Sequence, residues 1–214
     1  MKVGILGTGV AGTALATGFV TLGHEVRMGA RSAGHEKARA WMSTTGGKGS
    51  EGTFADAAKF GDVLVMATLG VANPEVVEAA GPAHFDGKIV IDATNPLDFS
   101  GGFPPDLAIK GNDSGGETLQ RLLPRAKVVK AFNIVTSALM FRPELQGGPP
   151  DMLIAGDDSE AKKVVTGILA DFGWPRAIDV GGIKSARWLE AMCIIWVMAC
   201  GASGNWRQAF RLLG

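Results

Sequence analysis

The chain opens with a short apolar stretch that runs directly into three closely spaced glycines. Residues 3–6 read as a buried strand, and Gly7, Gly9 and Gly12 follow in the spacing Gly-x-Gly-x-x-Gly, ahead of an Ala/Gly/Leu-rich segment through Leu22. In this order the first glycine permits a tight turn, the second lets phosphates approach the backbone, and the third lets a helix pack closely on the sheet. The sequence therefore predicts a strand, a phosphate-binding turn and a helix.

Such a turn suits the pyrophosphate of a dinucleotide, because free backbone N–H groups and the positive end of the helix dipole face the phosphates. A glycine-rich turn that holds no ligand is the alternative. The expected contact residues are Gly7, Thr8, Gly9, Val10, Ala11 and Gly12.

The end of the next predicted strand, residues 25–29, indicates which dinucleotide is bound. NAD enzymes place an acidic residue there for the ribose 2′-hydroxyl, whereas this chain continues with Ala30, Arg31 and Ser32. Arg31 offers a planar fork of donors, Ser32 a hydroxyl at an expected helix N-cap, and Lys37 further positive charge. We therefore expect NADP(H) rather than NAD(H). The alternative is that Arg31 and Lys37 are only solvated charges at a helix start.

Charge and cysteine content narrow the class of protein. The formal net charge is zero and no basic cluster appears, so the pattern of a nucleic-acid-binding protein is missing. Cys193 and Cys200 are the only cysteines, and both lie in one apolar segment, where they are expected to be core residues rather than a metal site or disulfide framework. No small-residue cleavage site follows the first strand. We expect a cytoplasmic protein.

Strand and helix patterns alternate along the chain, which predicts an α/β fold of the Rossmann type, with a doubly wound, mostly parallel sheet. Further strands are expected at residues 63–66, 88–91, 127–130, 151–155 and 176–180, with an edge segment at 52–53. Helices are expected at residues 33–42, 54–60, from 73, 115–123, 157–170 and from 185, with a final turn or helix at 206–213.

Residues 147–150, Gly-Gly-Pro-Pro, mark the best candidate boundary between two parts of the chain. We expect a nucleotide-binding domain at 1–148 and a small C-terminal α/β appendage at 149–214 that ends in an apolar helix. Residues 191–202 carry no charge, yet they fall short of the roughly twenty apolar residues that cross a bilayer. An all-round apolar helix needs cover on every side. We expect a homodimer, with burial inside one chain as the alternative; the expected contacts are Trp188, Met192, Ile195, Trp196 and Ala199.

In doubly wound sheets, ligands bind beyond the carboxyl ends of the strands. Besides the glycine turn and Arg31, that rule selects residues 68–69, 95–97 and 132–133. Thr68 and Asn95 are expected near the ribose or the nicotinamide amide, with Leu69 and Asn133 beside them. Pro96 and Phe132 are expected to wall the nicotinamide ring.

The sequence offers no convincing proton donor for ketone reduction. It contains no tyrosine, and its three histidines fall at positions away from the expected crevice. Lys184, at the start of the last helix, is the one lysine that could point inward. Without a donor, an acceptor whose own ring system takes up hydride is favoured, because that transfer depends mainly on alignment.

The motifs together resemble the coenzyme F420-dependent NADP oxidoreductases. The resemblance rests on the segments 7–9, 22–25, 29–32, 92–97, 129–133, 155–158, 161–165, 186–190 and 209–213. It implies a dimeric enzyme that moves hydride between NADPH and a 5-deazaflavin, or a flavin, stacked on the nicotinamide, without covalent catalysis. It also implies that Thr8, Gly9, Val10, Arg31, Ser32 and Lys37 hold the NADP, with Thr68, Asn95 and Asn133 nearer the nicotinamide.

Two other functions are compatible with the same fingerprint. One is a reductase of imines or small carbonyl compounds, similar to the β-hydroxyacid dehydrogenases, with Lys184 as proton donor; such enzymes usually carry a much longer helical domain. The other is a non-catalytic module that senses NADP, which would apply if the crevice admitted no second ring.

Overall fold

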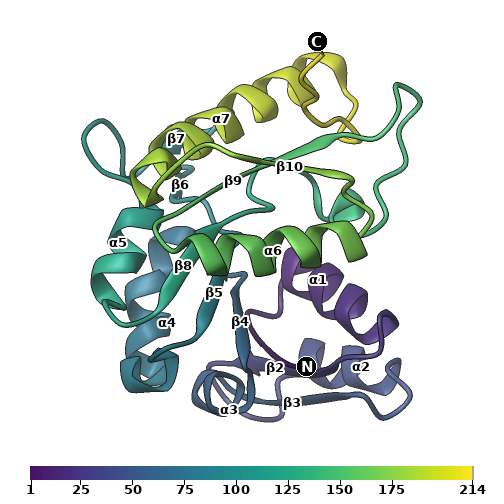
Figure 1. Cartoon of the computed structure of the whole chain (residues 1–214), viewed down its shortest axis with the longest axis vertical. Coiled ribbons are helices and arrows are strands. Elements are labelled where there is room, and N and C mark those ends of the chain that lie inside the picture. The colour runs from purple at the N-terminus through teal and green to yellow at the C-terminus, as the bar shows by residue number, and fades with distance from the viewer. Residues whose placement is uncertain (214) are drawn as a thin grey trace.

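Apolar, β-branched runs form the centre of a sheet of eight strands, in the order β10-β9-β8-β5-β4-β1-β2-β3. The computed structural model describes residues 1–213 (Figure 1). All neighbouring strands are parallel except β8 and β9, which pair antiparallel. The strands are β1 (Lys2–Leu6), β2 (Glu25–Ala30), β3 (Gly49–Thr53), β4 (Val63–Met66), β5 (Ile89–Asp92), β8 (Lys127–Lys130), β9 (Asp151–Gly156) and β10 (Arg176–Asp179). A separate two-stranded hairpin joins β6 (Leu97–Asp98) to β7 (Asp106–Leu107).

Helices cover both faces of the sheet, as a doubly wound fold requires. They are α1 (Val10–Thr21), α2 (Glu36–Ser43), α3 (Phe54–Phe60), α4 (Asn73–Ala80), α5 (Gly115–Leu122), α6 (Ser159–Asp171) and α7 (Ala186–Ser203). Buried side chains of α1, α2 and α6 belong to one core, and those of α3, α4 and α5 to a second core on the opposite face. The expected fold class is confirmed. The strands β9 and β10 extend the same sheet, so the division near residue 148 stays a prediction.

Helix α7 lies beyond the carboxyl end of β8 and beside β9 (Figure 1). Its inner side, which includes Leu189, Cys193 and Trp196, is buried against the rest of the chain. Its outer side leaves Trp188 and Ile195 more than half exposed. The segment Ile183–Ser203 meets a length and composition test for a membrane span, with a mean hydropathy of 1.2. In this structure, however, its inner side forms part of the protein core.

Three details differ from the sequence predictions. Helix α2 starts at Glu36 and His35 is its N-cap residue, so Ser32 does not cap it. Strand β3 begins at Gly49, earlier than the expected edge segment. Residues 206–213 form no helix, because Gly204 ends α7 in a left-handed conformation (φ 66°) and the tail runs back along β9. There, Asp151 holds the tail: its N–H donates to the Phe210 carbonyl and its carboxylate accepts from the Leu212 N–H.

Candidate functional site

The glycine turn after β1 has the geometry that its spacing predicts. Gly7 adopts a φ of 135°, and a Cβ there would lie 2.4 Å from the Ala67 carbonyl oxygen. A Cβ on Gly12 would lie 2.4 Å from the Gly7 carbonyl oxygen, so that glycine lets α1 approach the strand. A Cβ on Gly9 would meet nothing within 4 Å. Gly9 therefore borders open space at the start of α1, where no side chain caps the first-turn N–H groups.

The end of β2 lies beside this turn and is open to solvent. The Arg31 guanidinium lies 3.9 Å from the Glu75 carboxylate at the start of α4, and both side chains are about four-fifths exposed, at 83% and 78%. Ser32 is also exposed. An exposed pair of this kind is screened by water and contributes little to folding. Arg31 is therefore free to turn toward an anionic ligand.

Lys37 lies on the side of α2 that faces α1. It lines a cavity of about 660 Å³ together with Thr8 and Gly9 of the turn, Thr13 and Thr17 of α1, and Trp41 of α2. The indole Nε1 of Trp41 donates to the Thr17 hydroxyl at 3.2 Å, which holds the two helices together at the side of this cavity. The structure thus places Lys37 next to the turn, but on the α1 side of it.

A second cavity, of about 440 Å³, opens on the other side of the turn, at the carboxyl ends of β4 and β5. We call it the ring cavity. It is bounded by the turn, by the strand ends, by the chain after β8 and by the inner side of α7. Its lining comprises residues 9–11, 67–69, 93–95, 97, 132–133, 135–137, 140, 193, 196 and 197. Predicted site residues that line it are Gly9, Val10, Ala11, Thr68, Leu69, Asn95, Phe132 and Asn133.

Pro96 differs from the expectation of a ring wall. It is buried but does not line the ring cavity. It lies beside the N-terminus of α5 instead, where a Cβ on Gly115 would come within 3.3 Å of its ring.

Two asparagines form a reciprocal pair at the ring cavity. The Asn95 Nδ2 donates to the Asn133 carbonyl at 2.8 Å, and the Asn133 Nδ2 donates to the Asn95 Oδ1 at 2.9 Å and to the Leu189 carbonyl of α7 at 3.0 Å. The Asn133 Oδ1 is buried and has no hydrogen-bond partner among residues 1–213. Because an unsatisfied buried acceptor is costly, a ligand N–H is its natural partner.

Phe132 makes this arrangement possible through its backbone. Its φ of 63° lies in the left-handed region, which is uncommon for a residue with a bulky side chain. The turn buries the ring of Phe132 against Phe172, with ring centroids 5.8 Å apart, and presents Asn133 to α7. Strained backbone of this kind clusters at ligand sites.

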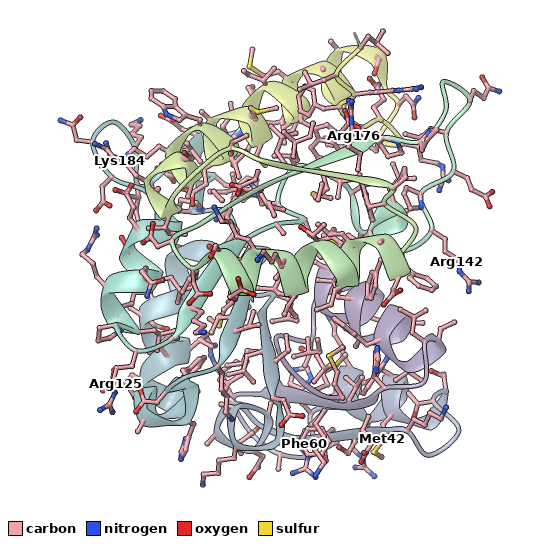
Figure 2. The ribbon with its side chains drawn as sticks, in the orientation of Figure 1. Met42, Phe60, Arg125, Arg142, Arg176 and Lys184 are labelled. Atoms are coloured by element: carbon pink, nitrogen blue, oxygen red, sulfur yellow. The ribbon has the colours of Figure 1, made fainter. Side chains whose placement is uncertain are left out.

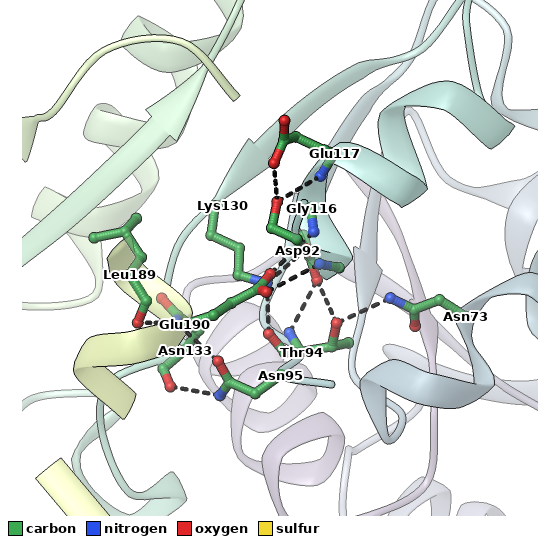
Figure 3. A network of polar contacts seen from close by, with 12 residues as sticks. Asn73, Asp92, Thr94, Asn95, Gly116, Glu117, Lys130, Asn133, Leu189 and Glu190 are labelled. Carbon is green, nitrogen blue, oxygen red and sulfur yellow. Dashed lines mark hydrogen bonds and ion pairs between the residues drawn. The ribbon is translucent and has the colours of Figure 1, made fainter. Parts of the chain in front are cut away.

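Behind the ring cavity lies a buried network of charged and polar groups (Figure 3). The Lys130 ammonium, fully buried at the end of β8, donates to the Asp92 carboxylate at 2.9 Å, to the Thr94 carbonyl at 2.7 Å and to the Glu190 carboxylate at 2.7 Å. Burial alone would lower the pKa of Lys130, but the carboxylates of Asp92 and Glu190 outweigh it and raise that pKa above its ordinary value. The lysine is therefore held as a cation.

Two hydroxyls and an amide continue the network to the ring cavity. The Thr94 hydroxyl donates to Asp92 at 2.7 Å and accepts from the Asn73 Nδ2 at 2.9 Å. The Thr68 hydroxyl, in the cavity wall, donates to the Asn73 Oδ1 at 3.2 Å. Sequence reasoning missed this network, although a lysine ending one buried strand and an aspartate ending its neighbour were visible signals.

Within residues 1–213, the ring cavity has no Asp, Glu, His, Lys or Arg in its lining. Its one thiol, Cys193, is buried, and that burial raises its pKa to about 11, so the thiol stays protonated near neutral pH. Lys184 lies in a short turn, Ile183–Ser185, and points outward at the molecular surface (Figure 2). The cavity is therefore built for binding and alignment, without an acid or base of its own.

Comparison with known proteins places this site in a family. The family model described as NADP oxidoreductase, coenzyme F420-dependent, matches residues 2–96. An F420-dependent NADP reductase of Methanothermobacter thermautotrophicus is 31% identical over 202 residues, which cover 89% of this chain and 85% of that protein. Metalloreductase STEAP3 of Rattus norvegicus is also 31% identical, over 206 residues, but this chain spans only 36% of its length.

The fold comparison agrees. The crystal structure of a putative F420-dependent NADP reductase from Arthrobacter sp. FB24 superposes with a TM-score of 0.95 and 36% identity, covering 100% of both chains. The similarity thus extends beyond the nucleotide-binding turn to α7 and the ring cavity. By sequence and by fold, the chain belongs to the coenzyme F420-dependent NADP oxidoreductase family.

Proposed function

We propose that the protein transfers hydride between NADP(H) and a planar acceptor of the deazaflavin or flavin type, with coenzyme F420 as the first candidate. The observation that carries this proposal is the ring cavity, which has mostly apolar walls, a buried amide acceptor and no carboxyl, imidazole or amine among its described lining residues. An acceptor that takes hydride into its own conjugated ring needs alignment more than acid–base help. Family membership supports the same activity.

The residues present fit a dinucleotide. The open space at Gly9 and the uncapped first turn of α1 suit a pyrophosphate, because backbone N–H groups and the helix dipole would face it. Arg31, with Ser32 and Lys37 nearby, would hold a 2′-phosphate. Asn133 would accept a hydrogen bond from a carboxamide through its unpartnered Oδ1. The bound NADPH supplies the hydride.

The rest of the site orients the rings and excludes water. The backbone of the turn and the Thr68 hydroxyl lie along one side of the ring cavity. Phe132 and the inner side of α7 close the other side with apolar surface, including Trp196. A mostly apolar cavity favours face-to-face stacking of two planar rings, and bound rings that fill it would protect the hydride from water. The chain's contribution is thus geometric rather than covalent.

The imine or carbonyl reductase alternative depends on a proton donor. Lys184, the residue that the sequence suggested for it, is exposed and lies outside the ring cavity. Nothing in the described part of the cavity replaces it. The deazaflavin or flavin acceptor is therefore the better proposal.

The test is a panel of acceptors. Purified protein is mixed with NADPH and, in parallel, with coenzyme F420, FMN, FAD, a set of imines and a set of keto acids, and NADPH loss is followed by absorbance. We expect NADPH to be consumed only in the reactions that contain a deazaflavin or a flavin. Turnover confined to an imine or keto acid would overturn the proposal, and NADPH binding without turnover on any acceptor would indicate a sensing module instead.

We also propose that two copies associate through the outer side of α7, where Trp188 and Ile195 are exposed on an apolar helix. Large exposed apolar groups aligned on one helix side are typical of protein interfaces. The balanced charge and the two buried cysteines are consistent with a cytoplasmic enzyme, which we propose as its location.

A further inference from the structure

The carboxylate of Glu190 is buried in the apolar helix α7, and the proposed hydride transfer makes no use of it. Its Oε2 accepts from the Gly115 N–H at 2.9 Å, and its Oε1 accepts from the Gly116 N–H at 3.0 Å and from the Lys130 ammonium at 2.7 Å. A buried carboxylate is tolerated only with partners this complete. It also lies at the positive end of the α5 dipole, which favours an anion there.

The residue before it contacts the site. The Leu189 carbonyl accepts a hydrogen bond from the Asn133 Nδ2, and that bond helps fix which way the Asn133 amide faces. With its Nδ2 engaged by Leu189 and Asn95, the amide of Asn133, a residue that lines the ring cavity, leaves its buried Oδ1 without a partner among the described residues. The position of the first turns of α7 therefore decides whether this acceptor is presented to a ligand.

We propose that Glu190 is a positioning residue that anchors α7 to α5 and β8, so that the Leu189 carbonyl holds Asn133 ready to orient the ring bound in the ring cavity. This inference rests on the proposed function, because it requires a nicotinamide ring in that cavity. Glu190 does not touch the ligand. It acts through Leu189 and Asn133, and through Lys130 and Asp92 in the buried network behind the ring cavity.

The chain offers a matched control. Glu117 of α5 also ties α5 to α7, through two hydrogen bonds of 2.7 Å with the Arg187 guanidinium. That pair is partly exposed, and neither of its side chains forms a hydrogen bond or ion pair with Asn133 or Lys130. Loss of either carboxylate weakens the junction between the two helices, but only loss of Glu190 disturbs the groups behind the ring cavity.

The experiment compares Glu190→Gln with Glu117→Gln in the full chain. It measures kcat and KM with the best acceptor, the Kd of NADPH, and the Kd of 2′,5′-ADP, which carries the adenosine half alone. Glu190→Gln should lower kcat by about tenfold or more, since small misplacements of reacting groups are costly, and leave the Kd of 2′,5′-ADP within about twofold. Glu117→Gln should leave kcat within about twofold. Equal losses of kcat in both variants would overturn the proposal.

The outcomes separate this inference from the proposed function. If wild-type protein binds NADPH but turns over no acceptor, the proposed function fails. The role of Glu190 is then tested by binding alone: Glu190→Gln should reduce the preference for NADPH over 2′,5′-ADP, measured as the ratio of their Kd values. An unchanged preference would overturn the inference. If wild-type protein does not bind NADPH, both are overturned.

Two further variants test whether Glu190 acts through Asn133 and provide a substitute in case Glu190→Gln does not fold. If Glu190 acts through Asn133, the double variant Glu190→Gln/Asn133→Ala should have about the kcat of Asn133→Ala alone, whereas additive losses would contradict that route. If Glu190→Gln does not fold, Gly116→Ala displaces α7 while every charge is kept, because its Cβ would lie 2.7 Å from that of Ala186. It should reproduce the kcat loss, and an unchanged kcat would count against the proposal.

Discussion

The two ends of the nucleotide-binding groove are built in opposite ways. At the β2 end, the side chains of Arg31 and Glu75 are about four-fifths exposed, and they contact each other only as a loose ion pair of 3.9 Å. At the β8 end, Lys130, Asp92 and Glu190 are fully buried, and the side chain of Asn133 is fixed by two hydrogen bonds. The glycine turn lies between the two ends.

This difference in burial suggests that the two ends contribute differently: one to the affinity for the nucleotide, the other to the alignment of its ring. Exposed charges can supply binding energy for a phosphate without constraining the fold, because they rearrange easily when a ligand arrives. Buried networks are costly to disturb and therefore rigid, which suits a site where ring orientation matters. The β2 end should thus govern which nucleotide binds, and the β8 end how it is aligned.

The largest expected effect on stability comes from removing the Lys130 cation at the β8 end. Lys130→Met leaves the buried carboxylates of Asp92 and Glu190 without their shared partner, and it should lower the free energy of unfolding by about 3–5 kcal/mol. Lys127→Met, on the same strand, breaks a partly exposed pair with Asp158 and should cost less than about 1 kcal/mol. Urea unfolding of both variants is the measurement. Similar losses in the free energy of unfolding would contradict the claim that the buried network at the β8 end is costly to disturb.

The next effect concerns selectivity at the open end. Arg31→Ala should weaken the binding of NADPH by about 1.5–3 kcal/mol, which is the range for a lost hydrogen bond to a charged group. The binding of NADH should stay nearly unchanged. Arg39→Ala, an exposed arginine on α2, is the control and should change neither. Titration calorimetry with both nucleotides decides the matter, and equal weakening of NADPH and NADH would refute the role of Arg31.

A smaller effect, on the association of two copies, should come from the outer side of α7. The inner side of the same helix carries Glu190, which belongs to the β8 end. Ile195→Lys places a charge on the proposed contact between two copies and should raise the dimer dissociation constant by about tenfold or more. Val164→Lys changes an exposed apolar residue on α6 and should have no such effect. Light scattering across a dilution series provides the test, and a wild-type monomer would contradict the dimer itself.

The smallest expected effect concerns reactivity within the ring cavity. Because burial raises the pKa of Cys193 to about 11, only about one molecule in a thousand carries the thiolate at pH 8. Iodoacetamide should therefore leave activity intact at pH 8, while labelling of Cys193 should accelerate about tenfold for each pH unit up to about 11. Mass spectrometry of the labelled peptides checks this. Rapid labelling at pH 8 would mean that the cavity is wetter than its walls indicate.

Elements set by local patterns were predictable from the sequence. The run Val63–Met66 is apolar throughout and forms a fully buried central strand, and the spacing of Gly7, Gly9 and Gly12 gives the turn after β1. Ser114 also caps α5, by accepting a hydrogen bond from the Glu117 N–H, although the Glu117 carboxylate accepts from the Ser114 hydroxyl and not from the Ser114 N–H, so the capping box is incomplete.

Other features depend on contacts distant in sequence, which no local pattern contains. Ser32 does not cap α2: in the turn before that helix the Gly34 N–H donates to the Glu51 carboxylate of β3, and α2 begins only at Glu36. The expected helix at 206–213 failed because Asp151, some sixty residues earlier, holds that segment extended. The partners of Glu190 lie 60–75 residues away, so only the fold brings them together.

The hydrogen bonds from the first turn of α5 to Glu190 also affect how fast the backbone amide protons of that turn exchange with water. First-turn amides of a helix ordinarily lack internal partners and trade hydrogen for deuterium quickly. Those of Gly115 and Gly116 are instead bonded to a buried carboxylate. The beginning of α5 should thus be among the last places in the chain to pick up deuterium, released only when the whole molecule opens.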